Sequence, residues 1–255
     1  EANTNGSGMF AYLDNVSTLD LSGLDTSNMT SMSKMFYKST SLTNIDTSGF
    51  DTSKVVSMYG MFWECSNLIT IDVSSFDVSK VKNMSLMFNN CSLLEKLDLS
   101  NFNTQSLEGS IYLMFGNCSN LISLDLSSFN TNKVTSMGYM FYNCRKLSNL
   151  NVSNFDISNV TNMEFMFDNC NSLEKLDLSN FDTNKVTNIN YLFFNCSKLK
   201  TIYVSNLWSI SSVSTSVNMF TSCTSLVGTV PFDSSKTDVS MANYTNGYLT
   251  YKSNN

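Results

Sequence analysis

A pair of apolar residues, Met-Phe in eight copies and Leu-Phe in one, recurs along the whole chain at nearly constant spacing. The pairs begin at Met9, Met35, Met61, Met87, Met114, Met140, Met166, Leu192 and Met219. Successive pairs are therefore 26 or 27 residues apart. A fixed period in this range is the signature of a solenoid, in which each coil stacks only on its neighbours. The repeat thus predicts one elongated stack of coils and excludes two independent globular domains.

Within one repeat, the apolar residues occupy fixed places that indicate strands and turns. Counted from the third pair, these inward places are Met61, Phe62, Cys65, Leu68, Ile71, Val73, Phe76, Val81 and Met84. From Thr70 to Ser74 polar and apolar residues alternate, which is typical of a strand with one buried face. From Val81 the spacing changes to three and four, which favours a short helical or 3₁₀ turn. We therefore expect a leucine-rich-repeat-like solenoid of about eight coils, with short parallel strands on one face and short helical or 3₁₀ turns on the other.

The limits of the repeat divide the chain into three expected parts. Residues 1–8 precede the first pair and are expected to be an N-terminal extension, and residues 9–223 form the solenoid. Residues 224–255 lose the register and contain the sole proline, Pro231. Because the last coil of a solenoid exposes apolar core, we expect this segment to be a C-terminal cap. The opening "EANTNGSGMF" is neither a signal peptide nor an initiator start, so we interpret the chain as a mature piece or an excised domain.

Seven cysteines each lie four residues after the first member of a pair. They are Cys65, Cys91, Cys118, Cys144, Cys170, Cys196 and Cys223, and Ser39 takes the place one coil earlier. Metal sites need several ligands close together, and neither histidine nor a second cysteine accompanies any of these residues. Stacked side chains that point in parallel toward a core suit the dihedral angle of a disulfide poorly. We expect buried free thiols that act as small apolar residues, and we expect no metal and no cofactor.

Composition and motifs argue against several classes of function. The chain has no histidine, none of the glycine-rich phosphate-binding motifs, and no serine motif with a base beside it. Its net charge of −6 argues against nucleic-acid binding. No apolar run approaches the roughly 20 residues of a membrane-spanning helix, so no membrane insertion is expected. These features together favour a non-enzymatic protein, which we expect to be a monomer.

A column of acidic residues follows the outward side of the expected strands. The column contains Asp20, Asp46, Asp72, Asp98, Asp125, Asn151, Asp177 and Tyr203, and a serine stands two residues after each. Like charges stacked across strands are destabilising, so the column needs an explanation. Either the carboxylates accept hydrogen bonds from neighbouring serines and threonines and stay solvated, or they form a stripe for a basic or cation-bridged partner. On the second hypothesis the partner-binding residues are Asp20, Asp46, Asp72, Asp98, Asp125, Asp177 and Tyr203. Calcium-binding loop motifs are missing from the sequence.

Two further columns have structural interpretations. One contains the polar residues Asp25, Asp51, Asp77, Asn103, Asn130, Asp156 and Asp182, which precede the expected turns and are expected to cap free N–H groups there. The other contains aromatic residues near the Met-Phe pairs, among them Tyr139, Phe165 and Tyr191 in consecutive coils. These rings are interpreted as partly buried rungs between coils, and a contact patch is the alternative.

The consensus "MFxxCSxLxxLDLSxFDTSxVTxMxxMF" resembles the repeat of the BspA-like leucine-rich-repeat surface proteins of host-associated bacteria. The tail "LVG…FDSSKTDVSMAN…NGYLT" resembles the segment that follows the last repeat in those proteins, so the resemblance covers roughly residues 9–250. It implies an extracellular or cell-surface location and adhesion to a host or microbial surface protein or glycan. It implies no catalytic residues.

Two other functions are compatible with a solenoid. A structural spacer or stalk would hold another domain away from the cell and would bind nothing itself. A binder of ice or mineral would need one residue type repeated along a face, and the column that flanks the aspartates instead mixes Thr18, Asn44, Thr70, Lys96, Ser123, Asn149, Lys175 and Thr201.

Overall fold

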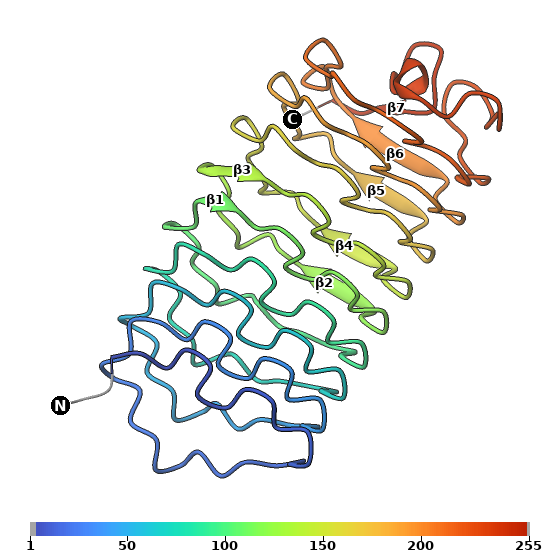
Figure 1. Ribbon diagram of the computed structural model, residues 1–255. Coiled ribbons are helices and arrows are strands. Elements are labelled where there is room, and N and C mark those ends of the chain that lie inside the picture. The colour runs from blue at the N-terminus through green and yellow to red at the C-terminus, as the bar shows by residue number, and fades with distance from the viewer. Residues whose placement is uncertain (1–3, 254–255) are drawn as a thin grey trace.

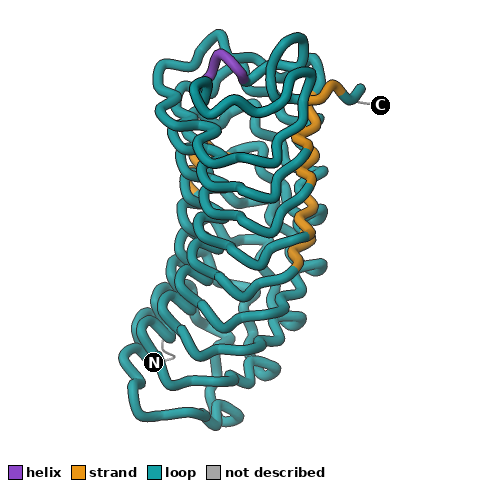
Figure 2. Tube along the Cα trace, turned by 90° about the vertical axis from the view of Figure 1, so that its right-hand side faces the viewer, coloured by secondary structure: helices purple, strands orange, loops and turns teal. Residues whose placement is uncertain are grey.

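The computed structural model describes residues 4–253, which wind into a column of stacked coils (Figure 1). The N-terminal coil lies at one end of the column and the C-terminal segment lies at the other. A view from the side shows the middle coils with similar outlines, and the column bends gently along its length (Figure 2). The predicted leucine-rich-repeat-like solenoid is confirmed. The division at residues 8 and 223 stays a prediction, although Gly6 and Gly8 already donate hydrogen bonds to the carbonyls of Ser31 and Ser33.

The strands are short and parallel, and they lie on two faces of the column (Figure 1). On the face that carries the aspartates, here called the strand face, the strands are β2 (Ser123–Asp125), β4 (Asn149–Asn151), β5 (Lys175–Asp177), β6 (Thr201–Val204) and β7 (Thr250–Tyr251). Strands β1 (Gly109–Ser110) and β3 (Val134–Ser136) pair on a different face. Equivalent residues face each other across the strand face, as Leu124 faces Leu150 and Leu176 faces Ile202. This register places each residue type of the repeat in a vertical column.

The corner that contains the Met-Phe pair is a run of tight turns. The N–H of Met87 donates to the carbonyl of Met84 at 3.1 Å, and the N–H of Asn89 donates to that of Leu86 at 3.0 Å. Leu86 and Asn90 have φ angles of 62° and 63°, in the left-handed region that a right-handed helix cannot contain. The expected short helical or 3₁₀ turns are therefore replaced by successive tight turns with a left-handed residue at every fourth position. Among residues 4–253 the one 3₁₀ helix is η1 (Val239–Met241), which lies after the last repeat.

Alternate N–H groups of this corner join one coil to the next. Phe88 donates to the carbonyl of Met114 at 2.9 Å, and Asn90 donates to that of Gly116 at 2.8 Å. Half of the backbone donors thus close turns within a coil while the other half tie neighbouring coils together. This division satisfies the buried backbone without either a helix or a wide sheet.

Two files of phenylalanine rings form the centre of the core. The rings of the Met-Phe pairs lie 5.5 to 5.9 Å apart and within 18° of parallel, from Phe10 at one end to Phe220 at the other. The second file stands at the inward place that Phe76 occupies in the repeat, and it comprises the buried rings Phe50, Phe76, Phe102, Phe129, Phe155 and Phe181. Stacked rings of this kind add about 0.5–1.5 kcal/mol per pair beyond the area that they bury. Contacts between identical residues thus help to hold neighbouring coils together.

The seven cysteines are buried and free, as the sequence predicted. Each thiol also does something that the sequence did not predict, because its Sγ donates a hydrogen bond of 2.8 to 3.2 Å to a phenylalanine carbonyl of the preceding coil. Ser39 makes the same bond to Phe10 with its hydroxyl at 2.6 Å, which explains why serine replaces cysteine there. Burial raises the pKa of every thiol, to about 12 at Cys65, Cys118 and Cys223. The thiols therefore stay protonated and unreactive in the folded protein.

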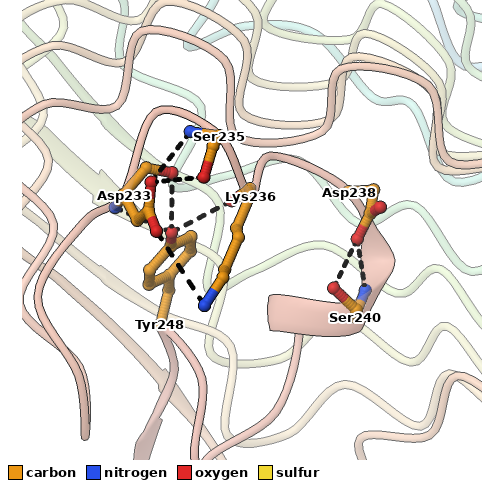
Figure 3. A network of polar contacts seen from close by, with 6 residues as sticks. All are labelled: Asp233, Ser235, Lys236, Asp238, Ser240 and Tyr248. Atoms are coloured by element: carbon orange, nitrogen blue, oxygen red, sulfur yellow. Dashed lines mark hydrogen bonds and ion pairs between the residues drawn. The ribbon is translucent and has the colours of Figure 1, made fainter.

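The C-terminal segment covers the last ring of the first file. Tyr248 is fully buried and meets Phe220 edge-on at 5.3 Å, so it ends the stack. Its hydroxyl accepts the N–H of Asp233 at 2.9 Å and lies 3.1 and 3.0 Å from the carbonyls of Asp233 and Lys236 (Figure 3). Asp238 accepts the N–H of Ser240 at 2.9 Å and so caps η1 (Figure 3). These hydrogen bonds tie the terminal ring of Tyr248 to the loop that contains Asp233 and Lys236.

Candidate functional site

Every aspartate of the acidic column, and Asn151 with them, holds a turn, and Tyr203 is the one member that does not. In each coil the side chain accepts the backbone N–H of the serine two residues later, at 2.9 to 3.1 Å. The accepting residues are Asp20, Asp46, Asp72, Asp98, Asp125, Asn151 and Asp177. A side chain that binds the backbone N–H two residues later turns the chain, and it does so in place of a hydrogen bond that would continue a strand. The structural explanation of the column is thus present in the molecule, and Asn151 shows that the turn needs an oxygen but no charge.

The second polar column makes the same type of turn. Asp25, Asp51, Asp77, Asn103, Asn130, Asp156 and Asp182 each accept the N–H of the residue two positions later. The predicted capping of free N–H groups is confirmed, although the capped element is a turn. Hydrogen bonds from Ser53 lower the pKa of Asp51 the most. The charges of the nearby Lys54 and Lys80 lower it a little further.

Hydrogen bonding also keeps the aspartates of the strand face ionised. The bonds from Ser48 lower the pKa of Asp46, whereas the charges of Asp20 and Asp72 act weakly in the opposite direction. The pKa of Asp98 and that of Asp125 are lowered by the backbone and side chain of the following serine. Hydrogen bonds to the charged form thus outweigh repulsion along the column. At neutral pH the strand face carries one full negative charge in each of these coils.

The structure separates the predicted site residues into two groups. Asp20, Asp46, Asp72, Asp98 and Asp125 lie exposed in five consecutive coils, and among residues 4–253 none of them has an ion-pair partner. We call these five residues the acidic stripe. Asp177 instead forms an ion pair with Lys252, whose ammonium group also lies 5.8 Å from the centre of the Tyr203 ring. Asp177 and Tyr203 are therefore held by the C-terminal segment and do not continue the stripe.

Sequence reasoning missed Lys252 because its contact with Asp177 spans 75 residues. Nothing in a single lysine of the tail indicates that the tail returns to the strand face. The contact depends on β7, which pairs with β6 and so carries the following residue across the face. Burial raises the pKa of Asp177, and the hydrogen bonds from Lys252 and Ser179 outweigh it, so the net direction is downward.

The predicted aromatic rungs lie on a different face and are half-buried. The rings of Tyr139 and Phe165 stack at 4.4 Å, and those of Phe165 and Tyr191 stack at 4.5 Å. Burial, with a smaller effect from Glu164, raises the pKa of Tyr139 to about 12. Because each ring covers the face of the next, this file presents ring edges and not free ring faces. Such an arrangement joins coils, and it offers little flat surface to a ligand.

A second cluster from the same aromatic column lies near the N-terminus, and the lysine that it holds was not predicted. The ammonium group of Lys34 lies 5.1 to 5.7 Å from the ring centres of Tyr37, Tyr59 and Trp63. Contacts of a cation with ring faces at this distance are favourable, by about 0.5–1 kcal/mol where exposed. The cluster therefore binds a lysine of its own chain.

No arrangement typical of metal or membrane chemistry is found in the part of the chain that the structure describes. Residues 4–253 contain no group of three or more His, Cys, Asp or Glu side chains placed to hold a metal ion. No helix within this range has the length and apolar character needed to cross a membrane.

Comparisons with known proteins agree with a repeat protein of the leucine-rich type. The family described as "Mycoplasma protein of unknown function, DUF285" matches residues 4–121 and 109–231. No curated protein sequence matches the chain significantly.

Three solved structures are similar to the chain at low identity. A leucine-rich repeat protein of T. pallidum is 18% identical, with a TM-score of 0.35, and the match covers 57% of this chain and 72% of that one. A leucine-rich repeat protein of Bacteroides ovatus ATCC 8483 is 20% identical, with a TM-score of 0.29 and coverage of 80% and 71%. A leucine-rich cell surface protein of Faecalibacterium prausnitzii A2-165 is 16% identical, with a TM-score of 0.28 and coverage of 79% and 76%.

Proposed function

The chain belongs to the DUF285 family, and from this premise we propose that it is a non-enzymatic, extracellular binding module of a bacterial surface protein. Its BspA-like repeat supports a role as an adhesin. The partner is a host or microbial surface protein with a basic surface, and the chain binds it as a monomer through the acidic stripe. No cofactor takes part.

The observation that carries this proposal is the acidic stripe itself. Five ionised carboxylates stand in consecutive coils, and they are exposed and lack an ion-pair partner within residues 4–253. The turn that each carboxylate closes would be closed equally by asparagine, as it is at Asn151. Five repeated charges therefore exceed what the fold requires. Complementary charge on a partner would speed association and fix the orientation of binding.

A triple variant tests the proposal without disturbing the fold. Asp72→Asn, Asp98→Asn and Asp125→Asn together keep the oxygen that each turn needs and remove three charges from the stripe. The matched control is Asp51→Asn, Asp77→Asn and Asp156→Asn, which removes three charges from the second polar column. Binding to a lysine-rich peptide and to immobilised matrix proteins is measured at low and at high salt.

We expect the stripe variant to lose about tenfold or more in affinity at low salt and to show a weaker dependence on salt. The control variant should keep both properties. Equal losses in the two variants would show that only net charge matters. If neither variant changes binding, the stripe does not bind a basic partner and the solenoid is better described as a spacer.

A further inference from the structure

A polar groove opens on the strand face between the coils of β4 and β5. Its cavity of about 270 Å³ is lined by Leu150 and Ser153 from one coil and by Asp177 and Asn180 from the next. A second cavity of about 380 Å³ lies on the other side of β4, and Leu150 and Asn151 line both. Strand β4 therefore separates two adjoining hollows of similar size. We call the first of them the neutral groove.

The groove exists because the strand face opens at this point. Strand β4 pairs with β2, and β5 pairs with β6, but within residues 4–253 no strand pairing joins β4 to β5. The carboxamide of Asn180 donates to the carbonyls of Val152 and Phe155 at 3.2 and 2.7 Å, and so bridges the two coils from the side. Leu150 is only half-buried here, whereas Leu124 and Leu176 in the same column are 2% and 1% exposed. The opening thus exposes one apolar side chain between polar walls.

The charge of the neutral groove differs from that of the acidic stripe. The column of carboxylates stops at Asp125, because the next coil carries the carboxamide of Asn151. In the following coil Asp177 is ion-paired with Lys252, which lines the groove from the C-terminal segment. One anion and one cation therefore cancel within the groove. The remaining polar groups are carboxamides and hydroxyls, which both donate and accept hydrogen bonds.

This lining selects a class of ligand by its chemistry. A phosphate or carboxylate ligand would need excess positive charge, and a basic side chain would need excess negative charge. A purely apolar ligand would leave the polar walls without partners. A neutral, polyhydroxylated ring satisfies both kinds of group, because its hydroxyls donate and accept and its C–H face can lie on Leu150. A cavity of about 270 Å³ lies just below the usual range of small-molecule sites, roughly 300–1,000 Å³, which suits a single ring.

We propose that the neutral groove binds one neutral hexopyranose unit of a glycan and that the adjoining hollow across β4 receives the next unit. The neutral groove is separate from the acidic stripe, whereas Asp125 at the end of the stripe lines the adjoining hollow. Sugar binding in the groove does not depend on the stripe binding a protein. A partner that is a glycoprotein could then engage both surfaces along the same face.

The test uses the whole chain and two families of probe. Neutral disaccharides (lactose, maltose, cellobiose and mannobiose) and a broad array of neutral glycans are compared with disaccharides that carry a uronic acid. Binding is followed by saturation-transfer NMR and by titration calorimetry. We expect at least one neutral disaccharide to bind at millimolar concentration or below and the acidic disaccharides not to compete with it.

Two variants locate the site. Asn151→Asp keeps the oxygen that closes the turn, as Asp125 does, but replaces the amide donor by a charge between the two hollows. We expect this variant to lose at least tenfold in affinity for the disaccharide. The control Asn130→Asp makes the same change in the second polar column, which lines neither hollow, and should bind the sugar unchanged.

Three results would overturn the proposal. These are the absence of binding by every neutral probe, a preference for the acidic disaccharides, and an affinity that Asn151→Asp leaves unaltered. None of them bears on the binding of a basic protein, which the triple stripe variant tests separately.

Discussion

Replacing Asp125 tests whether the aspartates of the strand face hold their turns by geometry or by charge. The carboxylate of Asp125 accepts the N–H of Ser127 at 2.9 Å, and Asn151 accepts the N–H of Ser153 at 3.1 Å in the adjacent coil. Asp125→Ala removes the acceptor and leaves the turn open. By analogy with helix caps, where the same type of bond is worth about 0.5–2 kcal/mol, we expect a loss of about 1 kcal/mol.

Asp125→Asn is the informative partner of that variant. It keeps the acceptor and removes the repulsion from Asp98, which opposes only weakly the lowering of the pKa of Asp125 by the hydrogen bonds from Ser127. We therefore expect its free energy of unfolding to stay within about 0.5 kcal/mol of the parent value, with any change on the stabilising side. The two variants are compared by urea unfolding, with the midpoint and slope fitted separately.

Two outcomes would refute the reasoning about the turn. If asparagine destabilises as much as alanine, the charge and not the acceptor holds the turn. If alanine costs nothing, the turn does not depend on the side chain at all. Either result would also remove the basis for using asparagine variants as fold-neutral probes of binding.

The remaining predictions concern buried groups. Cys118→Ala should lower the free energy of unfolding by about 1–2 kcal/mol, because it empties a packed site and removes the donor to Phe88. Cys118→Ser should lower it less, because Ser39 shows that a hydroxyl makes the same bond. Urea unfolding ranks the two variants, and a serine variant less stable than the alanine variant would contradict this. The native chain should not react with a thiol reagent, and all seven cysteines should react once it unfolds. Asp168 is 4% exposed, and burial raises its pKa to about 7, while Asn169 acts in the opposite direction. Because the unfolded carboxyl titrates near ~3.9, the folded chain binds more protons between about pH 4 and 7, so stability falls as pH rises through that window. Asp168→Asn should remove this loss, about 1–3 kcal/mol, and an unchanged dependence of the melting temperature on pH would contradict the assignment.

The repeat period made most of the architecture predictable. A constant interval fixes which residues stack, so the buried cysteines and the second phenylalanine file followed directly from their positions. The hydrogen bond from each thiol was not predictable. It depends on the direction in which the corner of the preceding coil points its phenylalanine carbonyl, as at Phe88 for Cys118. The spacing at the corner predicts a short helical or 3₁₀ turn wrongly, because apolar spacings of three and four also arise from successive tight turns.

The site was predictable only in part, for a related reason. The acidic stripe follows from the register alone, because Asp72 and Asp98 occupy the same place in neighbouring coils. The separation of Asp177 from the stripe does not, because its pairing with Lys252 depends on the path of a segment outside the repeat. The neutral groove also depends on a local loss of strand pairing beside Leu150, and no residue type signals it.

Anomalous diffraction from sulfur gives the most direct test of the stacked columns on which the whole account depends. In a crystal of the chain, the anomalous difference map locates each sulfur without assuming a fold. The account predicts that the seven cysteine sulfurs lie in one file inside the column, one per coil and none joined to another. Sulfurs that are scattered over the surface, joined in disulfides or gathered around an ion would contradict it.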